Sequence, residues 1–335
     1  MQYYRAGIIL FFFYYNDIIL LKPKSGGYSL KMLRGKFSNK SLYNIAIATC
    51  VLGIVLLTLY LVNINSFENR SEIGKIELFV KTINSPQGMA FDQSGRLFAQ
   101  SEWDGKISII SNDGKATDYS YIEDYYGYGM DIDYSDNFIL ASKQQITVYN
   151  NSGKVIRVIK GFTHAYDVAV GSDNTLFVSD SATNSIYQIT PKNEVILLTV
   201  LGDKKSNSTH NAAGICFDDD FKNLYAVNMY SGELFQISIS QAYKVEEIKI
   251  IASNLKRPNF IDVDEDNNVF ITCLGDNTIV RVNQNSIKEP IDTKGKISNP
   301  SGIVINNNEK VLYIGSKDNN SIYKINIVTN SKTKK

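Results

Sequence analysis

The chain has 335 residues, of which 44% are hydrophobic and 21% charged, a globular composition with room for one large domain or two ordinary ones. Its 35 basic and 34 acidic residues give a formal net charge of +1, which excludes charge-driven nucleic-acid binding as the main function. Three cysteines and two histidines exclude a disulfide framework and a histidine-rich metal centre.

An apolar run, residues 43–64, carries no charge, and the nearest charged residues are Lys40 and Glu68. As a helix it would be about 33 Å long at 1.5 Å per residue, enough for a hydrocarbon layer of about 30 Å. The run therefore predicts a single transmembrane helix that acts as an uncleaved signal anchor.

The two flanks of this run differ in charge. After it the charges are mixed, whereas the residues before it are mainly basic: Lys22, Lys24, Lys31, Arg34, Lys36 and Lys40. This bias predicts that residues 1–42 are cytoplasmic and that the chain crosses the membrane once, so that everything from the linker 65–74 onward is extracytoplasmic.

A second apolar stretch, residues 8–21, is interrupted by Asn16 and Asp17 and is too short to span a membrane comfortably. One interpretation is that translation starts at Met32, because the residues that follow it form an ordinary basic lead-in to a signal anchor. N-terminal sequencing of the protein tests this hypothesis.

Six repeats occupy residues 75–328, before a short tail, 329–335. Each opens with an alternating apolar strand and continues with an Asp/Asn/Gly-rich turn, a second strand, a polar loop and a third strand. Equivalent opening positions are 41, 38, 47, 46 and 42 residues apart: Gly88, Gly129, Asp167, Gly214, Phe260 and Gly302. Repeats of this length predict an all-β fold, a six-bladed β-propeller.

The last repeat ends at Ile325 without room for a fourth strand. Residues 76–80, which precede the first repeat, have a strand pattern but belong to no repeat. We expect this segment to pair with the last blade and close the ring, because closure hides an otherwise exposed sheet edge.

The repeat opening P-x-G-(apolar)-A-(apolar)-D, as in Pro86–Asp92, precedes a G-x-L-(aromatic)-(small) strand. This pattern resembles the NHL-type repeat and the propellers of the regucalcin/gluconolactonase and strictosidine-synthase-like families, over roughly residues 75–328. A propeller behind one N-terminal anchor is also similar to membrane-bound members of the strictosidine-synthase-like and paraoxonase group. The resemblance implies the fold more than an activity, because these propellers include lactonases, lyases, synthases and binding modules.

Members of the gluconolactonase type hold a divalent cation, Ca²⁺ or Mg²⁺, with a Glu from the first blade and Asn or Asp from later blade openings. In this chain those positions carry Gln87, Ala213 and Asn259. Only Asn259 remains a plausible metal ligand, and one neutral amide does not hold such a cation. The resemblance thus leaves a divalent cation as the cofactor to test, without a ligand set for it.

A site is expected at the axial mouth, where the loops entering the innermost strands meet the loops between second and third strands. The candidate ligand-binding residues there are Gln87, Glu102, Tyr128, His164, Tyr166, Asn211 and Asn259. His164 and His210 act there either as general acid and base or only as polar loop residues. Trp103 is either a stacking platform or part of an ordinary exposed loop, and the tyrosine-rich residues 118–129 either form a ligand or partner lip or pack over the blade edge.

Aspartates occur at two kinds of position. Asp131 and Asp262 lie within opening strands, and we interpret them as polar lining of an axial channel. The others lie in first hairpin turns, where side-chain bonds to the turn backbone explain them: Asp92, Asp133, Asp218 and Asp264.

Two functions of different class remain. The favoured one is a membrane-anchored binding module that holds a small molecule or a protein partner, and no nucleic acid, at its axial mouth. The alternative is a metal-dependent hydrolase or lactonase of the gluconolactonase type. The altered metal positions favour binding, and a metal analysis with an ester and lactone screen separates the two functions.

Overall fold

The computed structural model describes residues 10–14, 17–24, 27–33, 72–121, 127–202 and 211–328. They belong to two compact units, residues 1–71 with 329–335 and residues 72–328. The expected membrane segment, 43–64, lies outside the described residues. Within the described ranges no helix is both long and apolar enough to cross a membrane.

In the first unit three strands form a small antiparallel sheet in the order β1–β2–β3. They are β1 (Leu10–Tyr14), β2 (Asp17–Lys24) and β3 (Gly27–Leu33). Ile19 of β2 lies between Phe12 of β1 and Met32 of β3. The apolar stretch 8–21 therefore supplies residues to two strands of a sheet, and the start of translation at Met32 stays a prediction.

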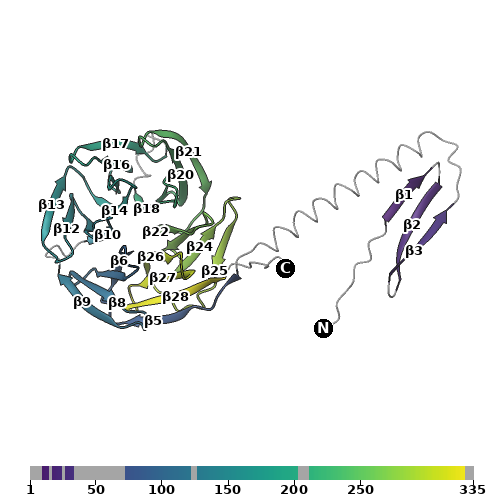
Figure 1. The fold of residues 1–335 in the computed structure, drawn as a ribbon, viewed down its shortest axis with the longest axis horizontal. Coiled ribbons are helices and arrows are strands. Elements are labelled where there is room, and N and C mark those ends of the chain that lie inside the picture. The colour runs from purple at the N-terminus through teal and green to yellow at the C-terminus, as the bar shows by residue number, and fades with distance from the viewer. Residues whose placement is uncertain are drawn as a thin grey trace. The chain divides into compact units, whose positions relative to one another are not determined.

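The second unit is a ring of six antiparallel sheets, the blades, around a central axis (Figure 1). In each blade the strands follow one another from the axis to the rim. The innermost strands contact their neighbours around the axis: β6, β10, β14, β18, β22 and β26. This arrangement confirms the predicted all-β, six-bladed propeller.

Blades 1 to 3 each use four consecutive strands. Blade 1 consists of β6 (Pro86–Phe91), β7 (Leu97–Ser101), β8 (Lys106–Ile110) and β9 (Ala116–Tyr121). Blade 2 consists of β10 (Gly127–Ile132), β11 (Phe138–Ser142), β12 (Gln145–Tyr149) and β13 (Val155–Lys160). Blade 3 consists of β14 (Ala165–Val170), β15 (Leu176–Asp180), β16 (Ser185–Ile189) and β17 (Val195–Val200).

Blades 4 and 5 repeat this order, and blade 6 borrows its outer strands from the start of the unit. Blade 4 consists of β18 (Ala212–Phe217), β19 (Asn223–Asn228), β20 (Glu233–Ile239) and β21 (Val245–Ala252). Blade 5 consists of β22 (Pro258–Val263), β23 (Val269–Cys273), β24 (Thr278–Val282) and β25 (Lys288–Ile291). Blade 6 consists of β26 (Pro300–Asn306), β27 (Val311–Ser316) and β28 (Ser321–Val328), joined by β5 (Glu77–Lys81) and β4 (Glu72–Ile73).

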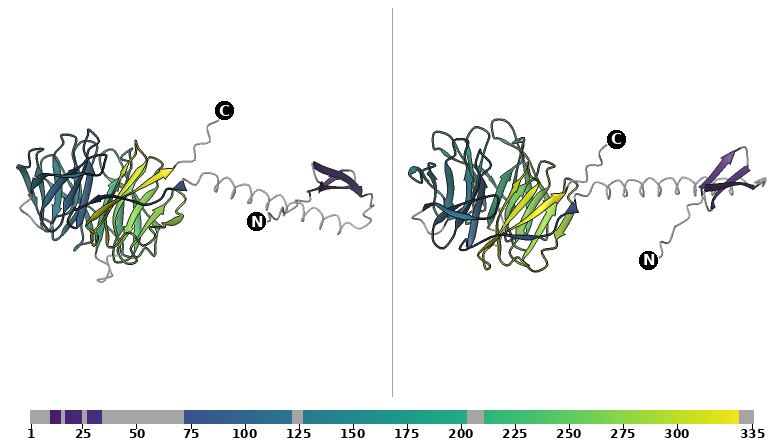
Figure 2. Two further views of the ribbon diagram at one scale, coloured as in Figure 1. Left: turned by 90° about the horizontal axis from the view of Figure 1, so that it is seen from below. Right: turned by 60° about the horizontal axis from the view of Figure 1, so that its bottom comes forward.

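The borrowed strands close the ring as predicted. β5 pairs antiparallel with β28, with Val80 opposite Ile322, and β4 pairs with the end of β28, with Ile73 opposite Ile327. Figure 2 shows the dark blue strand beside the yellow one at this point. The last strand of the propeller is thereby covered instead of being left as an open edge.

The core lies between the blades. The second strand of most blades is buried along its whole length, because it has a neighbouring blade on each face. Phe98, Phe177 and Phe270 occupy equivalent positions in this strand and are less than 2% exposed. Phe98 contacts Phe138 of the next blade, with ring centroids 5.0 Å apart. Each such buried side chain contributes about 1.5–3 kcal/mol, so the repeated aromatic residue holds neighbouring blades together.

The glycine of the repeat opening allows the innermost strands to approach closely. A Cβ atom on Gly302 would lie 2.0 Å from the carbonyl oxygen of Gln87 in the next blade. A Cβ atom on Gly214 would lie 2.6 Å from the carbonyl oxygen of Asn259. Any side chain at these positions would push the neighbouring backbone outward, which explains glycine in the P-x-G opening.

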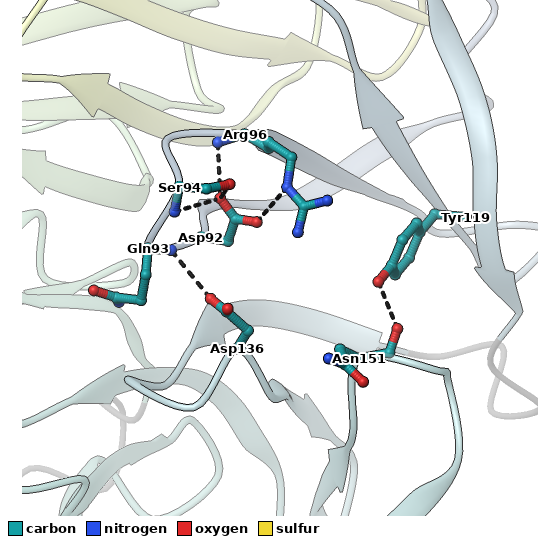
Figure 3. A network of polar contacts seen from close by, with 7 residues as sticks. All are labelled: Asp92, Gln93, Ser94, Arg96, Tyr119, Asp136 and Asn151. Atoms are coloured by element: carbon teal, nitrogen blue, oxygen red, sulfur yellow. Dashed lines mark hydrogen bonds and ion pairs between the residues drawn. The ribbon is translucent and has the colours of Figure 1, made fainter.

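The first hairpin turn of the blades is held by its aspartate, as predicted. Asp92 accepts hydrogen bonds from the backbone N–H groups of Ser94 and Arg96 at 3.0 and 2.8 Å, and it accepts one from Arg96 Nε at 2.6 Å (Figure 3). The equivalent aspartates accept backbone bonds in the same way: Asp133, Asp218 and Asp264.

The same region shows how adjacent blades are joined by polar contacts. The N–H of Gln93 in blade 1 donates to the Asp136 carboxylate of blade 2, and the Tyr119 hydroxyl donates to the Asn151 carbonyl (Figure 3). Tyr119 also contacts the Phe98 ring, at 5.1 Å between centroids. Tyr119 belongs to the tyrosine-rich residues 118–129. Of the two roles considered for them, its contacts favour packing over the blade edge.

Candidate functional site

We call the mouth the end of the axis where the chain enters each innermost strand. There a backbone N–H just after the second strand donates to the carbonyl of the residue just before the first strand. This bond recurs in blades 1, 3, 4, 5 and 6 at 2.9 to 3.2 Å, and its donor–acceptor pairs are Glu102–Ser85, Ser181–His164, Met229–Asn211, Leu274–Arg257 and Lys317–Asn299. The two kinds of loop therefore meet at one end of the propeller, as the repeat pattern predicts.

An aromatic cluster occupies the mouth. Tyr128 of blade 2 stacks on Tyr166 of blade 3, with centroids 5.0 Å apart and planes at 19°. Tyr166 stacks in turn on Phe260 of blade 5 at 5.7 Å, and His164 contacts Tyr128 at 5.0 Å. Tyr166 is 8% exposed, whereas Tyr128 and His164 are only half-buried. The half-buried rings offer an aromatic surface at the end of the axis.

Tyr166 and Asn259 form the polar centre of this cluster. The Tyr166 hydroxyl donates to Asn259 Oδ1 at 2.5 Å, and both side chains are buried. Burial raises the pKa of the Tyr166 phenol above its usual range; the charges of Asp167 and Glu102 act in the same direction, and Arg257 acts against them. Tyr166 therefore remains a neutral phenol near pH 7 and serves as a hydrogen-bonding group instead of a base.

His164 is held firmly at the side of the cluster. Its backbone N–H donates to the Asp180 carboxylate at 3.2 Å, and its Nδ1 lies 2.6 Å from Ser181 Oγ. When Nδ1 carries the proton, this contact leaves Nε2 as an acceptor that a ligand could use. His210, the other candidate general acid or base, lies outside the described residues.

Charged groups lie on the opposite side of the mouth, in blades 5, 6 and 1. Glu102 Oε2 accepts a hydrogen bond from Ser85 Oγ at 2.8 Å and lies 3.1 Å from Lys317 Nζ. The side chains of Lys317 and Glu102 are 16% and 21% exposed. Arg257 is exposed and has a left-handed backbone, with φ of 52°.

The remaining candidates lie at the same end but outside the aromatic cluster. Gln87 is 1% exposed, and its Oε1 atom has no hydrogen-bond partner within residues 72–121, 127–202 and 211–328. The side-chain amide of Asn211 lies 3.8 Å from Met229 Sδ in blade 4. Trp103 is 64% exposed and has no ring partner among the described residues.

Of the predicted residues, the structure joins Tyr128, His164, Tyr166 and Asn259 in one set of contacts. Phe260 and Arg257 were missed by the sequence reasoning. Both follow from the repeats, because Phe260 replaces the glycine of the opening and Arg257 is equivalent to His164 and Asn211.

Beyond the aromatic layer an axial channel of about 500 Å³ runs toward the first hairpin turns. Its wall includes Asp131 and Asp262, which confirms their interpretation as channel lining, and Asp167 as well. Exposed turn residues such as Tyr134 and Asp219 lie at its far end, so the channel reaches the surface opposite the mouth.

Each of the three channel carboxylates joins two blades. One oxygen accepts the N–H of the next residue and the other accepts an N–H of the adjacent innermost strand. The cross-blade bonds run from Val170 to Asp131, from Ile215 to Asp167 and from Ile305 to Asp262, at 2.8, 2.9 and 2.7 Å. Burial raises the pKa of Asp131 to about 6 and of Asp262 to about 7, and raises that of Asp167 well above its usual range.

The residues at the mouth do not fit a divalent cation. The three positions equivalent to the gluconolactonase ligands carry Gln87, Ala213 and Asn259, none of which bears a charge, and the Asn259 oxygen is bonded to Tyr166. In the part of the chain that the structure describes, no group of three or more His, Cys, Asp or Glu side chains is arranged to hold a metal ion. A hard cation needs several oxygen ligands, usually with negative charge.

No family model matches the sequence, and no curated protein matches it. Among solved structures, a gluconolactonase from Xanthomonas campestris has a TM-score of 0.66 at 13% identity, over 78% of this chain and 92% of that chain. A streptogramin B lyase has a TM-score of 0.60 at 15% identity, over 76% and 98%. A virginiamycin B lyase from Staphylococcus aureus has a TM-score of 0.55 at 14% identity, over 95% and 94%. At these identities the likeness shows the fold alone: a six-bladed β-propeller with structural neighbours of the gluconolactonase and virginiamycin B lyase type.

Proposed function

We propose that this protein is a membrane-anchored, extracytoplasmic binding module whose propeller holds a small organic ligand at its axial mouth. The observation that carries this proposal is the contact of Tyr128, His164 and Tyr166 with one another, and of Tyr166 with Asn259. The run 43–64 and its basic N-terminal flank support the anchor and its orientation.

The mouth has the features of a binding surface. Half-buried rings supply apolar contact area, and a few polar groups lie beside them, namely the imidazole of His164 and the charged groups of blades 5, 6 and 1. The rings are held by contacts between different blades, so little side-chain freedom remains to be lost when a ligand binds. A protein partner would use the same surface through the exposed Trp103 and is the other outcome of a binding screen.

A metabolite library tested by thermal shift and ligand-observed NMR examines this proposal. The double variant His164→Ala with Asn259→Ala is expected to unfold cooperatively but to bind at least about tenfold more weakly, about 1.4 kcal/mol. Its melting temperature falls as well, because a buried Tyr166 hydroxyl without its partner costs about 1–3 kcal/mol.

The matched control changes the other end of the propeller. Asp92→Ala with Asp264→Ala removes turn bonds at first hairpins, which lowers stability and leaves ligand affinity unchanged. Unchanged binding by the mouth variant, or loss of binding in the turn variant, contradicts the proposed location of the site.

A second candidate function is that of a hydrolase or lactonase of the gluconolactonase type. The fold likeness to a gluconolactonase supports it, and His164 is the described residue best placed to move a proton. An ester and lactone screen, run with EDTA and with added Ca²⁺ or Mg²⁺, tests it. Turnover that disappears in His164→Ala supports catalysis, whereas ligand binding without turnover supports the binding module.

A further inference from the structure

The mouth has two chemically different halves. Blades 2 and 3 contribute the rings of Tyr128, His164 and Tyr166, whereas blades 5, 6 and 1 contribute Arg257, Lys317 and Glu102. Tyr166 connects the halves, because its ring stacks on Tyr128 and its hydroxyl reaches Asn259, two residues from Arg257.

Among the described residues of the charged half, Glu102 and Lys317 form an ion pair. Lys317 neutralises the charge of Glu102, and the Ser85 hydroxyl donates to the same carboxylate oxygen, Oε2. Arg257 has no ion pair within the described residues, and it lies two residues before Asn259, which accepts the Tyr166 hydroxyl.

Other acids of the neighbouring loops are engaged locally. Asp276 accepts the Thr278 hydroxyl, and Asp318 accepts bonds from Ser298 Oγ and Asn299 Nδ2. Arg257 is exposed and is a cation of this half without an ion pair among the described residues.

The backbone of Arg257 fixes the position from which this cation extends. The residue is held in the left-handed region, at φ of 52°, directly before Pro258, and its carbonyl accepts the Leu274 N–H at 3.0 Å. A non-glycine residue in this region costs about 1 kcal/mol or more, and the surrounding bonds must hold it there. The Arg257 side chain therefore starts from a defined backbone position at the mouth.

We propose, on the basis of the proposed function, that the ligand class of this mouth is a flat ring compound bearing a carboxylate or similar anionic group. The ring stacks on the surface formed by Tyr128 and His164, and the anion pairs with Arg257, whose planar donors match a carboxylate. A cationic group is disfavoured beside Arg257, which repels it.

A matched pair of probes, 2-naphthoate and 2-naphthamide, tests the charge requirement on the intact protein. They share one ring system and differ in charge, so isothermal titration or ligand-observed NMR of both isolates the anionic group. We expect 2-naphthoate to bind about 3- to 10-fold more tightly, the range for a charge-assisted contact at a partly solvated site. The preference shrinks between 20 and 500 mM salt, because salt screens exposed charges.

Variants then locate the two parts of the site. Arg257→Gln is expected to bind both probes equally, whereas Arg257→Lys retains the preference for 2-naphthoate. Tyr128→Leu is expected to weaken both probes alike, because it removes the shared stacking surface. Lys222→Gln removes an exposed cation of a first hairpin turn and is the matched control, with no effect on either probe.

Equal binding of the two probes by the unaltered protein, or a preference that survives in Arg257→Gln, overturns the anionic ligand class. Absence of binding by both probes overturns it too. If library compounds nevertheless bind in a manner that requires His164 and Asn259, the proposed function stands and only the ligand class is wrong. The comparison of probes and the salt dependence need no variant, so the test does not depend on whether Arg257→Gln folds.

Discussion

Three aspartates in the wall of the axial channel, Asp131, Asp167 and Asp262, each accept one N–H from their own strand and one from the next blade. Because the carboxylates lie deep in the channel wall, burial raises their pKa values, and they are more easily protonated in the folded chain than in the unfolded chain. Groups of this kind stabilise the fold most at low pH, and their contribution is lost as the pH rises through the folded-state pKa.

The variant Asp262→Asn tests this pH dependence of stability at one residue. Between about pH 4 and pH 7 the folded chain holds a proton on Asp262 that the unfolded chain has lost, so the free energy of unfolding of the unaltered protein decreases as the pH rises through this window. The variant has no such proton, and we expect its decrease from pH 5 to pH 8 to be smaller. It also loses one acceptor for Val263 or Ile305, which costs about 1–3 kcal/mol.

Urea unfolding at pH 5, 6.5 and 8 measures both effects. Asp266→Asn, at an exposed position in the adjacent hairpin turn, serves as the control and leaves the pH dependence as it was. If Asp262→Asn keeps the full decrease with pH, the channel carboxylates do not titrate as described.

At the scale of the element, β5 links the beginning of the propeller to its end. Burial changes along this strand, with Val80 1% exposed and Leu78 43% exposed, and its register with β28 shifts between these two residues. Ile76 and Ile83, which flank the strand, are buried as well. β5 thus belongs to the core of blade 6 on one face and to the surface on the other.

Removal of this element is expected to prevent folding. A protein shortened to start at residue 84 lacks β4 and β5 and is expected to be insoluble, whereas one that starts at residue 66 is expected to fold, because only the first exposes the edge of β28. Within the full chain, Val80→Asp buries an unpaired charge and abolishes the folded state, but Leu78→Asp changes stability by less than about 0.5 kcal/mol. Soluble yield and circular dichroism of these proteins measure whether they fold. Equal solubility of the two shortened proteins contradicts the role of β5 in closing the ring.

The inner three strands of each blade could be predicted from the sequence, but the rim strands could not. Second strands are short runs that begin with apolar, aromatic and β-branched residues after clear turn signals, as in Leu176–Asp180 after the turn at Asp173. Rim strands such as β9 (Ala116–Tyr121) bury one face in part only, so their apolar pattern is weak. The closing strand was predictable because residues 76–80 are rich in apolar strand-forming residues but belong to no repeat.

The site was predictable only in part. The repeat pattern predicts that all candidates lie at one end of the axis, the mouth. The structure brings four of them together there: Tyr128, His164, Tyr166 and Asn259. The stacking of Tyr166 on Phe260 could not be predicted, because the two residues lie in blades 3 and 5 and meet only through the curvature of the ring. The ligand contacts of Gln87, Glu102 and Asn211 stay predictions.

At the scale of the whole molecule, the membrane anchor stays a prediction from residues 43–64 and is tested through the location of the two chain ends. Epitope tags are added at each end, and antibody access is measured in intact cells and after permeabilisation. We expect the C-terminal tag to be accessible in intact cells and the N-terminal tag only after permeabilisation, because the basic flank stays in the cytoplasm. The opposite pattern, or release of the protein in a soluble form, contradicts the anchored topology.

Closure of the ring also sets an order of events during synthesis. The Ser85 N–H donates to the Asn320 side chain, 235 residues further along the chain, so the first-made strand of the propeller waits for its partner until nearly all of the propeller has been made. Blades 1 to 5 can assemble one after another from local hairpins, whereas the final pairing joins distant segments and is intrinsically slow. A ribosome that stalls before β28 therefore leaves a row of stacked blades with two unpaired ends, a form open to aggregation that only the last residues of the propeller remove.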